Sequence, residues 1–181
     1  MLQKRERRNQ NAENQSAGIM ILLLMGVAGA GKTTVGKLLA SQLGWEFADA
    51  DDYHSVANVE KMRHGIPLTD ADRDPWLQAL RALISAWLTA HKNAVLACSA
   101  LKQSYRDTLQ VSSEVRIVYL RVSSQVLQQR LRERHGHFMT EAMLQSQLAA
   151  LEEPTGAVTI DADAIAAAIV VEIRAKLRVI R

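Results

Sequence analysis

The chain has 181 residues, of which 48% are hydrophobic and 23% charged, enough for one domain with its own core. The longest apolar run, residues 19–25, is far shorter than the roughly 20 residues of a membrane-spanning helix, which argues against a membrane protein. The net charge is +3, but residues 1–18 hold four basic and two acidic side chains, so the remainder carries only +1 and argues against a nucleic-acid partner.

The N-terminal segment, residues 1–18, is polar and lacks the apolar stretch of a secretory signal, so we expect a disordered tail. A basic arm that binds nucleic acid is the alternative for this segment. Residues 19–181 are expected to form a single domain. The one cysteine, Cys98, has no partner for an internal disulfide, which predicts a reduced, cytoplasmic protein.

Short, continuous apolar runs alternate with helical patterns along the rest of the chain. Such runs are typical of strands that are buried on both faces of a parallel sheet. The expected strands are 19–25, 45–49, 94–98, 115–120 and 157–161. The expected helices are 32–43, 55–64, 75–91, 102–110, 124–134, 140–151 and 163–178. This order predicts the α/β class, with helices on both faces of a five-stranded parallel sheet.

The helix at 75–91 allows a more detailed prediction. Asp74 is a suitable N-cap. Pro75 suits the first helical position, because a backbone N–H there would have no partner within the helix and its absence in proline costs nothing. Apolar residues, among them Trp76 and Trp87, then follow at helical spacing and are expected in the core.

The segment GVAGAGKT at 26–33 matches the phosphate-binding pattern G-x-x-x-x-G-K-[ST] in full. It follows the first expected strand and opens the first helix, so its amides can surround a polyphosphate. Lys32 supplies a positive charge for the phosphates and the Thr33 hydroxyl can ligate Mg²⁺. The residues predicted to bind nucleotide are Gly26, Val27, Ala28, Gly29, Ala30, Gly31, Lys32, Thr33 and Thr34. A glycine-rich turn without a ligand is the alternative.

The second expected strand ends in three closely spaced carboxylates, Asp49, Asp51 and Asp52. Alternate residues of an extended segment point the same way, so Asp49 and Asp51 are expected to share one site near Mg²⁺ and the transferred phosphate. A solvated acidic turn is the alternative. A strand ending in Asp occurs otherwise only at Asp161, and no Asn-Lys-x-Asp motif of a GTPase is present.

Four spaced segments carry a family resemblance: the phosphate loop, DADDYHSVANVEKMRHGIPLTDADRDPW at 49–76, CSALKQSYRD at 98–107 and RLRERHGHFMTEAMLQSQLAALEEP at 130–154. Together they resemble the gluconokinases of the shikimate-kinase-like group of P-loop kinases. Ala28 and Ala30 depart from the serines that the family often has. The resemblance implies a three-layer P-loop kinase fold, with a substrate-binding segment at about 51–76 and a mobile lid at about 130–142.

The activity that the resemblance implies is transfer of the γ-phosphoryl group of ATP, with Mg²⁺, to the 6-hydroxyl of D-gluconate. Asp51 would accept or orient the hydroxyl proton, and Asp49 would help to hold Mg²⁺. Arg73 would bind the gluconate carboxylate bidentately, although pairing with Asp70 or Asp74 is the alternative. A homodimer is common in the family, and the sequence leaves the oligomeric state open.

Further residues are assigned to substrate or nucleotide on the same basis. His54, Asn58 and Lys61 lie on one face of an expected helix and would contact hydroxyls or carboxylate, unless that face is merely exposed. Ser99, Lys102 and Arg106 follow the third strand and would face substrate or phosphate. In the lid, Arg130 and Arg134 would reach the phosphates and His137 the substrate, unless this is a solvated basic helix.

Rival interpretations remain within and outside the kinases. Kinases of shikimate, adenylylsulfate or nucleoside monophosphates share the phosphate loop, but a monophosphate needs more arginines than residues 49–76 supply. A nucleotide-gated regulatory or nucleic-acid-binding module is the alternative from another class.

Overall fold

The structure is a computed structural model that describes residues 18–133 and 141–179. Its centre is a sheet of five parallel strands in the order β2-β3-β1-β4-β5. The strands are β1 (Ile21–Met25), β2 (Glu46–Asp49), β3 (Ala94–Ala97), β4 (Val115–Arg121) and β5 (Val158–Asp161). All of β1 and β3 is buried, as their continuous apolar sequences predict. The predicted α/β class and the five-stranded parallel sheet are confirmed.

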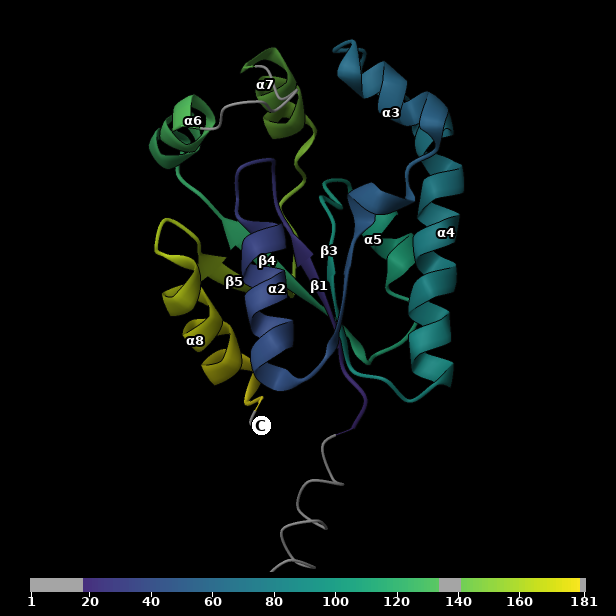
Figure 1. Cartoon of the computed structure of the whole chain (residues 1–181), viewed down its shortest axis with the longest axis vertical. Coiled ribbons are helices and arrows are strands. Elements are labelled where there is room, and N and C mark those ends of the chain that lie inside the picture. The colour runs from purple at the N-terminus through teal and green to yellow at the C-terminus, as the bar shows by residue number, and fades with distance from the viewer. Residues whose placement is uncertain (1–17, 134–140, 180–181) are drawn as a thin grey trace, which may run out of the picture.

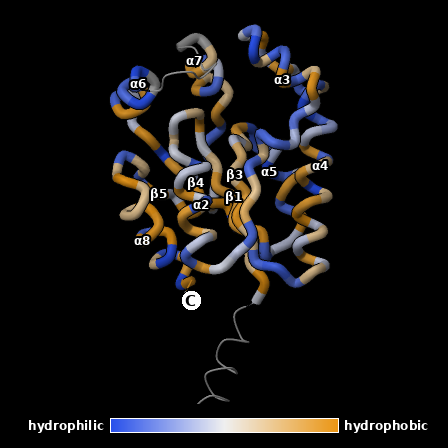
Figure 2. Tube along the Cα trace, viewed as in Figure 1, coloured by the Kyte–Doolittle hydropathy of each residue, from blue (hydrophilic) through white to orange (hydrophobic). Residues whose placement is uncertain are grey.

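Helices cover both faces of this sheet, so the protein has three layers (Figure 1). On one face, α2 (Lys32–Leu43) and α8 (Ala166–Leu177) pack on the side chains of Leu22 and Leu24. On the other face, α4 (Asp70–Thr89) and α5 (Gln103–Leu109) pack on Leu23 and Met25. The apolar residues gather in the sheet and on the helix faces turned toward it (Figure 2). None of the helices in the described ranges is long and apolar enough to cross a membrane.

Three further helices stand at the carboxyl end of the strands, where Figure 1 shows them above the sheet. They are α3 (Val56–Arg63), α6 (Ser124–Glu133) and α7 (Glu141–Ala150), and a 3₁₀ helix, η1 (Ala50–Tyr53), joins β2 to α3. A small apolar cluster of Val27, Leu101, Leu127 and Leu144 connects α6 and α7 to the loop after β1. This cluster holds the two helices over the carboxyl end of the sheet.

The predicted start of α4 is wrong. The helix begins at Asp70, with Thr69 rather than Asp74 as its N-cap, and Pro75 lies inside it. The Thr69 hydroxyl accepts the Asp72 N–H at 3.2 Å, and the Asp72 carboxylate accepts the Thr69 N–H at 2.9 Å. This capping box satisfies two free donors and outweighs the one backbone hydrogen bond that Pro75 cannot make. Trp76 and Trp87 are 4% and 8% exposed, so their predicted core position is confirmed.

Replacement of Thr69 by alanine tests the capping box. Thr69→Ala removes the side-chain acceptor for Asp72 N–H, and we expect a loss of about 1 kcal/mol in the free energy of unfolding. Thr89→Ala is the matched control, because the Thr89 hydroxyl at the other end of the same helix donates only to the Ser85 carbonyl within it. Urea unfolding of the two variants measures the difference. Equal losses would show that the cap does not stabilise α4.

Candidate active site

The phosphate loop connects β1 to α2 and leaves the start of that helix open. Gly26 has φ 149°, and a Cβ at this position would lie 2.8 Å from the Leu120 carbonyl oxygen, so only glycine fits. Gly31, the N-cap of α2, has φ 89° and provides no side-chain cap. The first amides of α2, together with the positive end of the helix dipole, are therefore directed at the cleft beside the loop. This arrangement is suited to a polyphosphate.

Lys32 and Thr33 at the start of α2 are already positioned by neighbouring groups. The Lys32 ammonium donates to the carbonyls of Gly26 and Val27 at 2.9 and 3.1 Å, which holds its charge across the mouth of the loop. The Thr33 hydroxyl donates to Asp49 Oδ2 at 2.6 Å. A hydroxyl and a carboxylate are the hard oxygen ligands that Mg²⁺ accepts. Thr33 and Asp49 together therefore fit the predicted metal site.

Asp49 and Asp51 both line the same cleft, whereas the extended geometry expected for residues 49–51 is wrong. Residues 50–53 form the 3₁₀ helix η1, and the Asp49 carboxylate caps it by accepting the Asp51 N–H at 3.1 Å. The cap turns the chain back so that Asp51 remains exposed at the cleft, while Asp52 is not among the residues that line it. Among side chains that the structure describes, no three His, Cys, Asp or Glu could hold a metal. A metal here would need oxygens from its ligand as well.

The cleft has a volume of about 510 Å³ and lies between the phosphate loop, η1, the segment that joins α3 to α4, and α7. Of the residues predicted to bind nucleotide, metal or substrate, it brings together Ala28, Gly29, Gly31, Lys32, Thr33, Thr34, Asp49, Asp51, His54, Arg73 and Ser99. A second cavity, of about 420 Å³, lies on the other side of the phosphate loop, between α2, α6 and the loop before α8. The two cavities share Gly29, Gly31 and Thr34, so one elongated ligand could occupy both.

Arg130 belongs to the second cavity. Its guanidinium donates to the Gly29 carbonyl at 3.1 Å and to the Ala162 carbonyl at 2.8 Å, so it joins the phosphate loop to the end of β5. The guanidinium therefore meets backbone carbonyls beside the phosphate loop, and its predicted contact with phosphates stays a prediction. Arg134 and His137, also assigned to the lid, lie outside the described residues.

His54 packs flat against Trp76 on the wall of the larger cleft. The two ring centroids are 4.5 Å apart with an interplanar angle of 9°, and the Trp76 indole N–H donates to the Ala50 carbonyl at 2.7 Å. Burial, followed by the positive charge of Arg73, lowers the pKa of His54 to about 4. Its Nδ1 is buried without a hydrogen-bond partner among the described residues. His54 is thus a neutral hydrogen-bonding group near pH 7, and Trp76 is both core and cleft wall.

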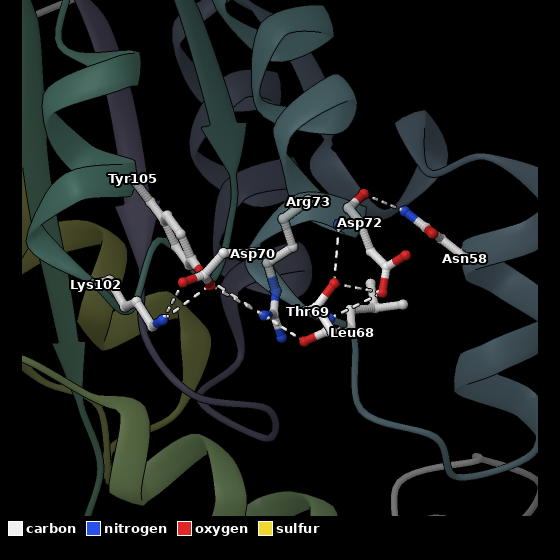
Figure 3. A network of polar contacts seen from close by, with 8 residues as sticks. All are labelled: Asn58, Leu68, Thr69, Asp70, Asp72, Arg73, Lys102 and Tyr105. Atoms are coloured by element: carbon white, nitrogen blue, oxygen red, sulfur yellow. Dashed lines mark hydrogen bonds and ion pairs between the residues drawn. The ribbon is translucent and has the colours of Figure 1, made fainter.

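Arg73 reaches the cleft from the second turn of α4, within a polar network drawn in Figure 3. One of its terminal nitrogens donates to the Leu68 carbonyl at 2.6 Å and lies 3.8 Å from Asp70. Asp70 receives two 2.8 Å hydrogen bonds from Lys102 and one from the Tyr105 hydroxyl, and these lower the pKa of the Asp70 carboxyl. The pairing of Arg73 with Asp70 is therefore long, and the short contacts of Asp70 go to α5.

Four residues predicted to contact substrate have other partners and do not line the larger cleft. Lys102 binds Asp70, as described above, and Lys61 binds the Asp72 carboxylate at 2.7 Å. Asn58 is 6% exposed and donates to the Asp72 backbone carbonyl at 2.7 Å, which joins α3 to α4. Arg106 is 1% exposed and donates to the carbonyls of Ala100 and Leu101 at 2.9 and 2.8 Å. Arg106 thus supports the loop that presents Ser99 rather than the ligand itself.

Residues of α7 are the part of the site that the sequence interpretation missed. Met143, Ser146 and Gln147 all line the larger cleft. Their spacing of three and four residues places them on one helix face, but nothing in that pattern shows what the face is turned toward. Gln147 also accepts the Ala28 N–H of the phosphate loop at 2.7 Å, a contact between residues far apart in the chain.

Comparisons with known proteins give consistent results. The family model described as shikimate kinase matches residues 28–174. A probable gluconokinase of Xenopus tropicalis is 43% identical in the matched region, which covers 87% of this chain and 93% of that protein. A gluconokinase of Gluconobacter oxydans is 49% identical over 134 residues, and the match covers 74% of this chain and 75% of that protein. The crystal structure of a gluconokinase from Sinorhizobium meliloti matches with a TM-score of 0.79 at 41% identity, covering 88% of this chain and 91% of that one.

The environment of His54 leads to a prediction about pH. Because the pKa is about 4 in the folded protein and ordinarily 6.5, the unfolded chain binds the additional proton between these values. The free energy of unfolding should therefore fall as the pH falls through this window. In His54→Phe, which keeps a flat ring on Trp76, the free energy of unfolding should fall less over the same window. Titration of the His54 ring by NMR measures the midpoint directly. A midpoint near 6.5 would contradict the packed position of the ring.

Proposed function

The chain belongs to the shikimate kinase family and, within it, to the gluconokinases, and on this basis we propose that it transfers the γ-phosphoryl group of ATP to the 6-hydroxyl of D-gluconate. The products are ADP and 6-phosphogluconate. The observation that carries the proposal is the cleft of about 510 Å³, in which the phosphate loop and Asp51 meet Arg73 and His54. Phosphate donor, proton acceptor and substrate contacts thus share one space.

The lining of the cleft suits a polyol with a single carboxylate. Gluconate needs one cation for its carboxylate and neutral groups for its hydroxyls. Arg73 can supply the cation, because a guanidinium meets a carboxylate in a bidentate manner. His54, Ser99 and Gln147 supply neutral hydrogen-bonding groups. Lys102 and Lys61 are neutralised by Asp70 and Asp72, so they do not turn the cleft into a site for a doubly charged substrate.

The nucleotide would extend from the phosphate loop into the second cavity. The amides at the start of α2 and the Lys32 ammonium hold the β- and γ-phosphates, as their geometry allows. The second cavity, beyond Gly29 and Thr34, then receives the nucleoside. Arg130 holds that cavity together through the carbonyls of Gly29 and Ala162, so it positions the nucleotide even where it touches no phosphate.

Thr33 and Asp49 would hold Mg²⁺ with their hydroxyl and carboxylate oxygens, which hydrogen-bond to each other in this structure. When bound, the ion neutralises charge on the β- and γ-phosphates. The remaining steps depend on the protein's own side chains, which hold the two substrates and receive the proton.

The transfer itself forms one bond and breaks another. The 6-hydroxyl oxygen of gluconate attacks the γ-phosphorus, the bond from that phosphorus to the bridging oxygen breaks, and ADP leaves with the electron pair. Asp51, which lines the cleft, orients the hydroxyl and accepts its proton. Because phosphoryl transfer proceeds through a loose transition state, alignment by Asp51 and charge compensation by Lys32 contribute more than early deprotonation.

Four other expectations from the sequence remain predictions. They are the lid at 130–142 with Arg134 and His137, a homodimer, the cytoplasmic location and the lack of a nucleic-acid partner. Cys98 is free and buried, and this burial raises the pKa of its thiol to about 12 and keeps it unreactive.

A coupled assay of ADP release tests the proposed function. The panel contains gluconate, other aldonates, shikimate, glucose and nucleoside monophosphates, each with ATP and Mg²⁺. We expect turnover with gluconate well above that with the other compounds. Turnover with shikimate and none with gluconate would overturn the proposal.

Arg73→Lys tests how the carboxylate is bound. The variant keeps the charge but loses the planar fork, so kcat/KM for gluconate should fall about ten- to hundredfold, the range of one charged hydrogen bond. The KM for ATP should hardly change, because Arg73 is not part of the phosphate loop. The matched control is Arg81→Lys on the same helix, where the arginine donates to the Thr108 carbonyl and does not line the cleft.

A further variant separates recognition from support of the loop. Arg73→Ala should also reduce the preference for gluconate over glucitol, its uncharged analogue. If Arg73→Ala instead lowers the melting temperature and leaves that preference intact, then Arg73 only supports the Leu68 carbonyl, and the carboxylate is bound elsewhere.

A further inference from the structure

Gln147 of α7 connects the larger cleft to the phosphate loop. Its side-chain oxygen accepts the Ala28 N–H at 2.7 Å, across a separation of 119 residues in the chain. Gln147 lines the cleft together with Met143 and Ser146 of the same helix. The apolar contact of Leu144 with Val27 and Leu127 holds this part of α7 over the loop. The position of the amide is therefore set by packing as well as by the hydrogen bond.

The hydrogen bond to Ala28 also fixes which way round the amide lies. A glutamine amide has one acceptor oxygen and an NH₂ group that only donates. If the amide were flipped, its NH₂ group would oppose the Ala28 N–H, and two donors would face each other. The oxygen is therefore held at the loop, and the NH₂ group is turned away from Ala28. Among the described residues this NH₂ group has no hydrogen-bond partner, so its two donors are available to a ligand in the cleft.

A neutral, oriented donor pair beside the phosphate loop is suited to the hydroxyl oxygen of a polyol. Building on the proposed function, we infer that Gln147 binds one hydroxyl of gluconate through its NH₂ group while its oxygen holds Ala28. One planar amide would then fix the distance between the sugar acid and the loop that carries the γ-phosphate. Such alignment affects the rate directly, because the acceptor oxygen must lie in line with the phosphorus. Gln147 is thus a determinant of specificity among aldonates.

The alternative is that Gln147 only supports the phosphate loop, and substrate analogues distinguish the two roles. The experiment uses the full chain with gluconate and a set of analogues that each lack one hydroxyl at C2, C3, C4 or C5 and keep the 6-hydroxyl that accepts the phosphoryl group. The variant is Gln147→Met, which keeps the length of the side chain but has no donor. The matched control is Gln145→Met, at an exposed position on the same helix. Melting temperature and the affinity for an ATP analogue are measured for each variant.

We expect Gln147→Met to lower kcat/KM for gluconate about three- to tenfold, the range of one neutral hydrogen bond. For one deoxy analogue, the one that lacks the hydroxyl bound by Gln147, the loss should be smaller than with gluconate, because only the contact with the Ala28 N–H is then missing from the variant. For the other analogues the loss should match that with gluconate. Gln145→Met should behave as wild type throughout. Gln147→Asn, with the same amide one methylene shorter, should give the same pattern and serves if Gln147→Met fails to fold.

Two results would overturn the inference. Equal losses for gluconate and for every deoxy analogue would mean that Gln147 supports the loop without binding substrate. Unchanged kinetics in both Gln147 variants would mean that it does neither. The wild-type protein separates these outcomes from failure of the proposed function, because turnover of gluconate by the wild type tests the function itself. The role of Gln147 is measured by the ratio of kcat/KM between variant and wild type for each substrate.

Discussion

The register of three parallel strands determines where the site can form. Asp49 of β2 is paired with Ala97 of β3, and Ala97 is paired with Leu24 of β1. Because the strands run in one direction, Asp49 stands level with the end of β1, where the phosphate loop begins. The Thr33 hydroxyl therefore meets the Asp49 carboxylate at 2.6 Å. A shift of β2 by one residue would turn Asp49 to the other face of the sheet and separate the two oxygen ligands.

Charge compensation on the first turn of α4 decides which cations can serve a ligand. Asp70 binds Lys102, and Asp72 binds Lys61. Among the described residues that line the larger cleft, the remaining cations are Lys32 of the phosphate loop and Arg73 of α4. In the proposed function, Lys32 binds the phosphates and Arg73 binds the substrate. This division explains how a cleft with several carboxylates nearby can still accept a negatively charged sugar acid.

The sequence predicts those parts of the fold and site that depend on neighbours in the chain. The apolar runs identify the strands, and the phosphate loop follows from its own pattern. The start of α4 is mispredicted because the sequence offers two possible starts, the capping box of Thr69 and Asp72 and the proline at position 75. The structure shows that the helix starts at the capping box. Pairings such as Lys61 with Asp72, or Gln147 with Ala28, depend on how separate helices are oriented. No local pattern contains that information, which is why the pairing of Lys61 with Asp72 was not predicted and Gln147 was missed.

The short stretch from Leu68 to Arg73 performs several tasks at once. It contains the helix cap, the two carboxylates that form ion pairs with neighbouring helices and Arg73, one of the two cations that line the larger cleft. The Arg73 guanidinium also donates to the Leu68 carbonyl. A single substitution in this stretch therefore affects more than one of these contacts. A replacement of Arg73 also removes the hydrogen bond to the Leu68 carbonyl and thereby loosens the segment that precedes α4. The charge of this part of the cleft is therefore coupled to the attachment of α4 to α3 and α5.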